Sequence, residues 1–379
     1  MLRLGVSAGV AVPLLVIGLL VVHACSVSAD QVQRARELTD EGWWDEAEEL
    51  LLGLLEEDRS NPEIYNNLAE IYLSRLARGQ EVDWGDMEKY AKKAVELDKT
   101  NASYYITLGD ILGIEAQRGN KLRAMGRAKD GRKAIESALA IDPDNIEARE
   151  WLLNYYVYAP GFAGGDKDKA RVQAEEIAEI DGVEGNMAWA LIYEDADENY
   201  EAAEAEYLKA LSAEPDEPRP YFAYAYFCSR RGEDDKARSI AMELLEKEWI
   251  DDATRTRVHM DLGFMYQGSE EWEKAAAEFT KSLEADSTEM RAVYQLGRTY
   301  IFAESNLDEA ERHYILYLSQ PRLKGWWPAR ADAHYRLAMV YNLKGEKEAA
   351  SREVEEALKL NPDHKGAKDL KRDIVYGRN

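Results

Sequence analysis

The fold is decided by a pattern that occurs twice in succession, as LGFMYQGSEEWEKAAAEF at residues 262–279 and as LGRTYIFAESNLDEAERHY at residues 296–314. Three positions recur at an interval of 34 residues: Leu262, Gly263 and Tyr266 match Leu296, Gly297 and Tyr300. Within each copy, apolar residues three or four apart indicate two amphipathic helices, and a short polar stretch between them indicates a turn. The repeated element is therefore a helix, a turn and a second helix.

The same pattern continues on both sides of these two copies. The last full unit runs from Leu337 and Ala338 to Pro362, which stands where a second helix must stop. Towards the N-terminus the units near residue 218 keep the period, and those before it match more loosely. Gly or Ala at the eighth position and Ala at the twentieth let the two helices approach closely, so each unit buries its apolar face against its neighbours.

These spacings resemble the tetratricopeptide repeat, and the resemblance covers the chain from Asp30 to about Asp363. It implies an all-α, right-handed superhelical solenoid of about nine helix-turn-helix units, with helical insertions. We expect residues 1–29 to be a signal peptide or anchor, residues 30–364 to be the repeat solenoid, and residues 365–379 to be a C-terminal cap helix.

The charge of the chain limits its partners. It has 379 residues and a net charge of −25, which argues against a nucleic-acid partner. The length fits about two globular domains or one elongated repeat array.

The N-terminus has the character of an export signal, because residues 5–22 are apolar apart from Ser7 and follow Arg3. Three outcomes remain open: cleavage after Ala29, lipidation of Cys25 within a bacterial lipobox-like sequence, or retention as a membrane anchor. All three place the body outside the cytoplasm, in the periplasm or at the outer membrane. Membrane contact is expected only through this segment.

Cys228 is the one cysteine of the body, so no disulfide framework is expected, and its apolar surroundings predict a buried core residue. Departures from the 34-residue period predict four insertions, at residues 78–86, 113–132, 157–168 and 319–329. For residues 113–132 the alternative to a functional loop is a lengthened helix pair. The pair Trp326 and Trp327 lies in the last insertion, either as an exposed anchor for a partner or packed against the last unit.

The third insertion is rich in glycine and precedes a helix. One interpretation of Gly161, Gly164 and Gly165, followed by Lys167, is an anion site built from backbone N–H groups. The alternative is a structural turn, because Asp166 is an N-cap residue whose carboxylate would occupy those donors. This insert is similar to one in exported bacterial repeat proteins of unassigned function.

The resemblance also implies a binding groove along the first helix of each unit, lined at positions two, five, nine, twelve and thirteen. In the C-terminal units these positions carry arginines and aromatic residues, which suit carboxylates and extended peptides. The competing interpretation is that the arginines form ion pairs with local glutamates. The candidate groove residues are Arg219, Phe222, Tyr226, Arg230, Arg257, Phe264, Arg291, Tyr294, Arg298 and Tyr335.

No pattern in the chain indicates catalysis. Its five histidines are scattered, and no metal-binding, nucleophile-elbow or phosphate-loop motif occurs. We therefore expect a non-enzymatic scaffold or adaptor without cofactor or metal, binding a protein or peptide. The alternative is an accessory subunit of an envelope transport system that closes its insert and arginines around a small acidic ligand. The oligomeric state is left open.

Overall fold

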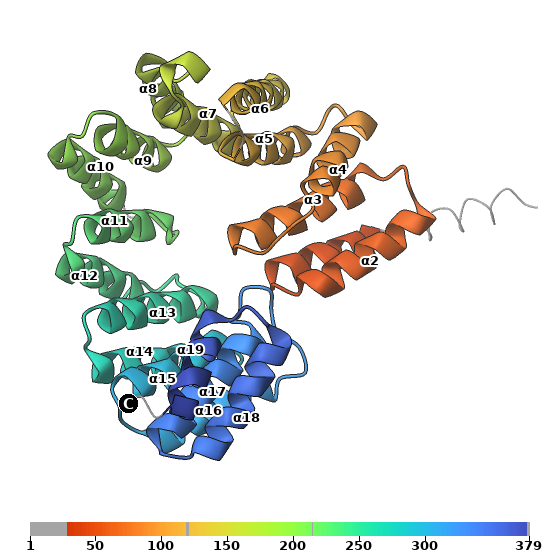
Figure 1. The fold of residues 1–379 in the computed structure, drawn as a ribbon. Helices are drawn as coiled ribbons and strands as arrows, with labels where there is room; N and C mark the ends of the chain where they lie inside the picture. Colours follow the sequence, from red (N-terminus) through yellow and green to blue (C-terminus); the bar gives the residue numbers. More distant parts are fainter. Residues whose placement is uncertain (1–28, 119–120, 214, 377–379) are drawn as a thin grey trace, which may run out of the picture. The chain divides into compact units, whose positions relative to one another are not determined.

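The computed structural model describes residues 29–118, 121–213 and 215–376, and every regular element within them is helical (Figure 1). The expected all-α class is confirmed. The expected signal segment and Cys25 lie outside the described residues, apart from Ala29. We predicted one repeat body, whereas the chain divides into two compact units at Ile141 and Asp142.

The first unit consists of three helix pairs. Its helices are an unlabelled one over residues 29–40, α2 (Trp44–Glu57), α3 (Pro62–Ala77), α4 (Trp84–Leu97), α5 (Ala102–Ala116) and α6 (Lys121–Ile141).

The second unit consists of six helix pairs and a final single helix. Its first part contains α7 (Ile146–Tyr158), the 3₁₀ helix η1 (Gly161–Ala163), α8 (Lys167–Ile180), α9 (Gly182–Leu191), the π-helix η2 (Ile192–Ala196) and α10 (Tyr200–Ser212). The pairs that follow are α11 (Arg219–Arg230) with α12 (Asp234–Leu245), α13 (Asp252–Gly268) with α14 (Trp272–Ala285), α15 (Met290–Phe302) with α16 (Leu307–Leu318), and α17 (Arg330–Leu343) with α18 (Lys347–Leu360). The last helix is α19 (Lys365–Tyr376).

The described ranges thus contain nine helix pairs, as the period predicted. The expected cap helix is also present, because α19 packs against α17 and α18. Ala367 of α19 is fully buried, and Gly366 lies against the ring of Tyr335. One of the four expected insertions is helical: much of residues 113–132 lengthens α6, so this region is a lengthened helix pair.

In two of the helix pairs a glycine of the first helix faces a large aromatic residue of the second. In α13, a Cβ atom added to Gly263 would lie 2.4 Å from the ring of Phe279 in α14. In α15, a Cβ added to Gly297 would lie 2.6 Å from the ring of Tyr314 in α16. Phe279 and Tyr314 are fully buried, so the seam within these two pairs is filled by one aromatic ring over one glycine.

Cys228 lies in the core of the second unit and is fully buried, as predicted. Burial raises the pKa of its thiol to about 11. In the part of the chain that the structure describes, no helix is both long and apolar enough to traverse a lipid bilayer.

We predict that Gly263→Ala destabilises the second unit, whereas Gly268→Ala in the same helix does not. The added methyl group at Gly263 would overlap the buried ring of Phe279, and overpacking of this kind costs about 1–3 kcal/mol of unfolding free energy. At Gly268 no atom lies within 4 Å of the added Cβ. Urea unfolding followed by circular dichroism measures both, and equal stability of the two variants would contradict the seam described above.

Candidate functional site

The expected groove residues lie on the first helices of the last four pairs, α11, α13, α15 and α17. Large exposed side chains mark this stripe: Tyr226 is 66% exposed, Phe264 40% and Phe302 44%. Exposed aromatic rings at regular intervals offer contact area to a partner. We call the expected groove residues on these four helices, together with Phe302, the stripe. Its parts differ in whether the arginines have carboxylate partners.

The arginines of α11 are neutralised by carboxylates from earlier helices. Arg219 donates to Glu184 of α9 at 2.5 Å and also to Glu150 of α7. Arg230 lies 3.2 Å from Glu194 and 3.2 Å from Asp195, both in η2. These two arginines are therefore paired within the protein, and they link successive helix pairs.

Two further arginines have local partners. Arg291 donates to Glu289, which precedes its own helix, at 2.8 Å. Arg257 lies 3.9 Å from Asp261 one turn along α13, and its guanidinium stands 3.8 Å from the ring centre of Phe222. The Arg257 side chain is nevertheless 62% exposed. Its charge is therefore only weakly compensated.

Arg298 and Arg336 differ from all of these. Their guanidinium carbons lie 5.3 Å and 5.7 Å from the ring centre of the same residue, Phe302. Among the described residues, no carboxylate oxygen lies within 4 Å of either guanidinium. The Nε atoms of both are buried and have no hydrogen-bond partner there. We call Arg298, Phe302 and Arg336 the two-arginine site.

The surroundings of the two-arginine site are polar but neutral. Arg298 makes long contacts of 3.5 Å to Gln267 and 3.4 Å to Gln295. Gln267 in turn donates to Thr299 at 2.7 Å, which fixes the floor between α13 and α15. Arg336 contacts the sulfur of Met339 at 3.4 Å and also interacts with the side chain of Tyr294. Two guanidinium groups beside one aromatic ring, without a counterion, are suited to hold a carboxylate.

Two of the expected groove residues do not line an open wall. Tyr294 is only 6% exposed, and its ring packs edge-on against Tyr314 and Tyr317 at 5.4 Å. Tyr335 packs against His364, with ring centres 4.8 Å apart, and against the cap helix α19. The expectation for Tyr294 is corrected: it is a core residue, because two tyrosines of α16 surround it.

The sequence interpretation missed Arg336. It stands at the sixth position of its unit, which the family pattern does not assign to the groove. The arginine side chain is long enough to bring its guanidinium to the ring of Phe302 on the neighbouring first helix. The signal that would have found it is its spacing: it follows Arg298 by 38 residues, which is the 41-residue interval from Leu296 to Leu337 less about one helical turn.

The glycine-rich insert is a structural turn. The N–H groups of Ala163, Gly164 and Gly165 donate to carbonyl oxygens within the insert, and that of Asp166 donates to Tyr156. The Asp166 carboxylate accepts the first amides of α8, at 3.1 Å and 3.3 Å. Gly164 has a φ of 105°, and a Cβ on Gly165 would overlap the carbonyl of Ala159. These donors are occupied, so the insert offers no anion site of the expected kind.

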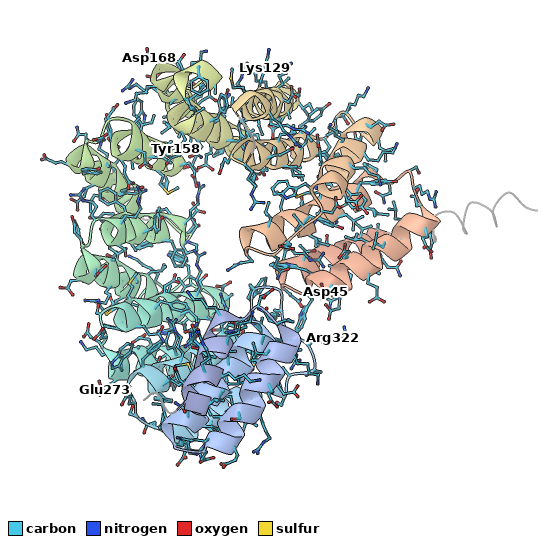
Figure 2. The ribbon with its side chains drawn as sticks, viewed as in Figure 1. Asp45, Lys129, Tyr158, Asp168, Glu273 and Arg322 are labelled. Carbon is cyan, nitrogen blue, oxygen red and sulfur yellow. The ribbon has the colours of Figure 1, made fainter. Side chains whose placement is uncertain are left out.

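The insert instead ties α7 to the π-helix η2. The Lys167 ammonium donates to the carbonyl of Ala196, and the Tyr158 hydroxyl donates to Asp195. Tyr158 lies at the end of α7 (Figure 2). The sequence pattern gave no indication of η2, which buries Glu194 beside Tyr207 while holding Asp195 at the surface for Arg230.

The tryptophans of the last insertion pack against the preceding helix pair. Trp327 contacts the core cluster around Tyr317, whose hydroxyl donates to Pro328 at 2.5 Å. Arg330 donates to the carbonyl of Leu318 at 2.8 Å and closes the loop. Trp326 is half-buried. The packed-loop alternative therefore describes Trp327, and this pair is not a fully exposed anchor.

Glu184 gives the second unit a predicted pH dependence. Its burial raises its pKa from 4.5 to about 7, and Arg219 opposes that rise. An unfolded Glu titrates near 4.5, so between these values the folded chain holds the proton more tightly. The free energy of unfolding then falls as the pH rises through this range.

Glu184→Gln should flatten this dependence, because glutamine cannot ionise but still accepts a hydrogen bond from Arg219. Between pH 5 and pH 8 the unaltered chain should lose about 1–3 kcal/mol more stability than the variant, measured by urea unfolding at each pH. Glu273→Gln is the control, because Glu273 is exposed on α14 (Figure 2). An unchanged slope in Glu184→Gln would show that Glu184 is ionised throughout.

Comparison with known proteins gives the following matches. The tetratricopeptide repeat family model matches residues 331–364, which span α17 and α18. No curated protein matches the chain. Similar solved structures include a thermophilic TPR protein of Thermus thermophilus, 19% identical over 53% of this chain and 98% of that one, with a TM-score of 0.44. PilF of Pseudomonas aeruginosa is 16% identical over 59% and 99%, with a TM-score of 0.41, and a tetratricopeptide repeat protein of Parabacteroides merdae is 16% identical over 72% and 98%, with a TM-score of 0.40.

The match covers one unit, and the other helix pairs share its architecture. The glycine that faces an aromatic ring recurs in α13 and α15 at the 34-residue interval, next to the matched unit. Residues 331–364 therefore form a tetratricopeptide repeat, and the other helix pairs of the described chain share its helix-turn-helix architecture.

Proposed function

We propose that this protein is a non-enzymatic scaffold that binds an acidic segment of a partner protein at the two-arginine site. The observation that carries the proposal is that Arg298 and Arg336 flank Phe302 without a carboxylate partner among the described residues. In a chain with 73 acidic and 48 basic residues, most arginines find an internal partner easily. Arg298 and Arg336 have no internal carboxylate partner among the described residues, so they are available for a carboxylate of another molecule.

The energetic argument favours an anionic partner. A partly buried guanidinium with an unused N–H donor carries an unfavourable desolvation cost. A carboxylate that enters between two such groups accepts charge-assisted hydrogen bonds and offsets this cost, whereas a neutral group does so less well. Each hydrogen bond to a charged group contributes about 1.5–3 kcal/mol.

The aromatic residues favour a peptide over an isolated anion. Phe264 and Phe302 are exposed on neighbouring first helices, and Arg257 lies further along the same stripe. An extended peptide can place a carboxylate between Arg298 and Arg336 and an apolar side chain on the neighbouring rings. A small acidic metabolite would use the arginines but leave the exposed rings without a role.

The accessory-subunit alternative has less support. It required the glycine-rich insert to bind a ligand through its backbone N–H groups and Lys167. The amides of residues 163–166 donate within the protein, and Lys167 donates to Ala196.

We further propose that the protein acts in the bacterial cell envelope. The support is the apolar segment of residues 5–22, followed by Cys25 and by the small residues up to Ala29, which suit export with cleavage, lipidation or anchoring.

The test uses two synthetic fluorescein-labelled peptides, one alternating Glu with Phe and one alternating Lys with Phe. The first should bind in a fluorescence anisotropy titration and the second should not. Replacing both arginines, by Arg298→Gln and Arg336→Gln, should weaken binding of the Glu peptide by about 10- to 100-fold, because charge-assisted hydrogen bonds are lost.

The matched control replaces two arginines on the second helices of the same pairs, by Arg312→Gln and Arg352→Gln. It removes the same net charge, so a general electrostatic effect would weaken binding equally in both variants. Circular dichroism checks the fold of each. Equal binding of the Glu peptide by the chain and its Arg298→Gln, Arg336→Gln variant would refute the proposed site.

A further inference from the structure

The charge of the chain reverses sign in one region of the first unit. Residues 84–141, which span α4, α5 and α6, contain eleven Lys and Arg and eight Asp and Glu, a net charge of +3. The chain as a whole carries −25, so the rest of it carries −28. The net charge of the whole chain conceals this region.

Much of the positive charge lies on one helix, α6. Residues 123–133 of α6 contain five basic residues and one acidic residue, Asp130. Lys129 and Lys133 are exposed, and neither has an ion-pair partner among the described residues. Lys129 lies on the side of α6 that faces away from α5 (Figure 2). Met125, also exposed, adds an apolar side chain to this helix.

The lysines of α4 extend the same surface. Arg127 of α6 donates to Glu88 of α4 at 2.6 Å and lies 2.9 Å from Glu115 of α5, so the helices are held side by side. Lys92 pairs with Glu88 at 2.7 Å but remains 58% exposed, and Lys89 is 72% exposed. We call Lys89, Lys92, Arg123, Lys129 and Lys133 the basic face.

A pocket opens in this basic face between α4 and α6. Its volume is about 290 Å³, and its floor is apolar. Its lining includes Lys92 of α4 and Arg127 and Lys133 of α6, and Asp130 is the one acidic residue in it. Three cationic side chains around one apolar-floored pocket match an anionic head group attached to a hydrocarbon chain.

We propose that the basic face binds a bilayer that contains anionic phospholipids, with the pocket receiving one phosphate group. Two observations favour a membrane as the occupant. The basic face opposes the charge of the rest of the chain, and the apolar segment of residues 5–22 directly precedes the first helix of the same unit. A single weak anchor is commonly supplemented by a cluster of basic residues near it.

The acidic helix α2 limits the contact to α4 and α6. It carries six acidic residues and no basic one, and it packs against α3, whereas α6 packs against α5. An acidic bilayer would repel α2 and attract the basic face, which gives the contact an orientation. Charges separated by more than about 8 Å are largely screened at physiological salt, so the local face decides the sign.

The experiment measures lysine accessibility in the full chain. The protein is reconstituted into neutral phosphatidylcholine vesicles and into vesicles with roughly 30% phosphatidylglycerol, briefly acetylated, and analysed by mass spectrometry. Lys89, Lys92, Lys129 and Lys133 should react at least about threefold more slowly on the anionic vesicles, and about 0.5 M salt should abolish the difference. Lys274, Lys281 and Lys359 in the second unit serve as internal references. Equal reactivity on both vesicles would overturn the proposal.

A charge reversal then tests the residues themselves. The variant Lys129→Glu, Lys133→Glu breaks no ion pair among the described residues, and it should lose the protection of Lys89 and Lys92 on anionic vesicles. The control Lys274→Glu, Lys281→Glu should keep it, and circular dichroism checks both folds. Protection that persists in the first variant would overturn the proposal. Equal protection by soluble polyglutamate on neutral vesicles would assign the face to an acidic protein instead.

Discussion

The close approach of two helices within each pair is the constraint on which the rest of the structure depends. In two pairs a glycine facing an aromatic ring permits it, as Gly263 faces Phe279 and Gly297 faces Tyr314, and in α5 Gly109 faces Ile135 of α6. Because the first helix is held this near the second, its opposite surface is left for neighbouring pairs and for solvent. The arginines and phenylalanines of the stripe are therefore exposed because the opposite face of the same helix packs against the second helix of its pair.

Charge pairing rather than residue type distinguishes the parts of this stripe. The chain offers so many carboxylates that an arginine at a junction between helix pairs is soon neutralised, as Arg219 and Arg230 are. Those arginines join successive pairs and contribute to the framework. Arg298 and Arg336 stand where the neighbouring positions carry Gln267, Gln295 and an aromatic ring. The neutral surroundings keep their charge available in a protein that otherwise repels acidic molecules.

Much of the fold could be predicted from the sequence, because a 34-residue period fixes the number of helices and their pairing. The site could be predicted only in part. The 34-residue period places Arg298 on the exposed side of its helix. It cannot show that Tyr294, four residues earlier, is buried against two tyrosines of α16. Nor can it show that Arg336 reaches across to Phe302. Such contacts depend on side-chain length and on the neighbouring helix, and a pattern along one chain contains neither.

Cys228 has a practical consequence that follows from its burial. It is the one thiol between Asp30 and Asn379, it is fully enclosed, and its pKa is raised to about 11. A thiol in this state reacts with neither oxidants nor alkylating reagents while the surrounding helices stay packed. In an oxidising compartment the folded chain is thus protected against forming intermolecular disulfides through Cys228. A chain in which the surrounding helices unpack loses this protection. The rate at which Cys228 is alkylated therefore measures local opening of the second unit, and no label has to be introduced for this measurement.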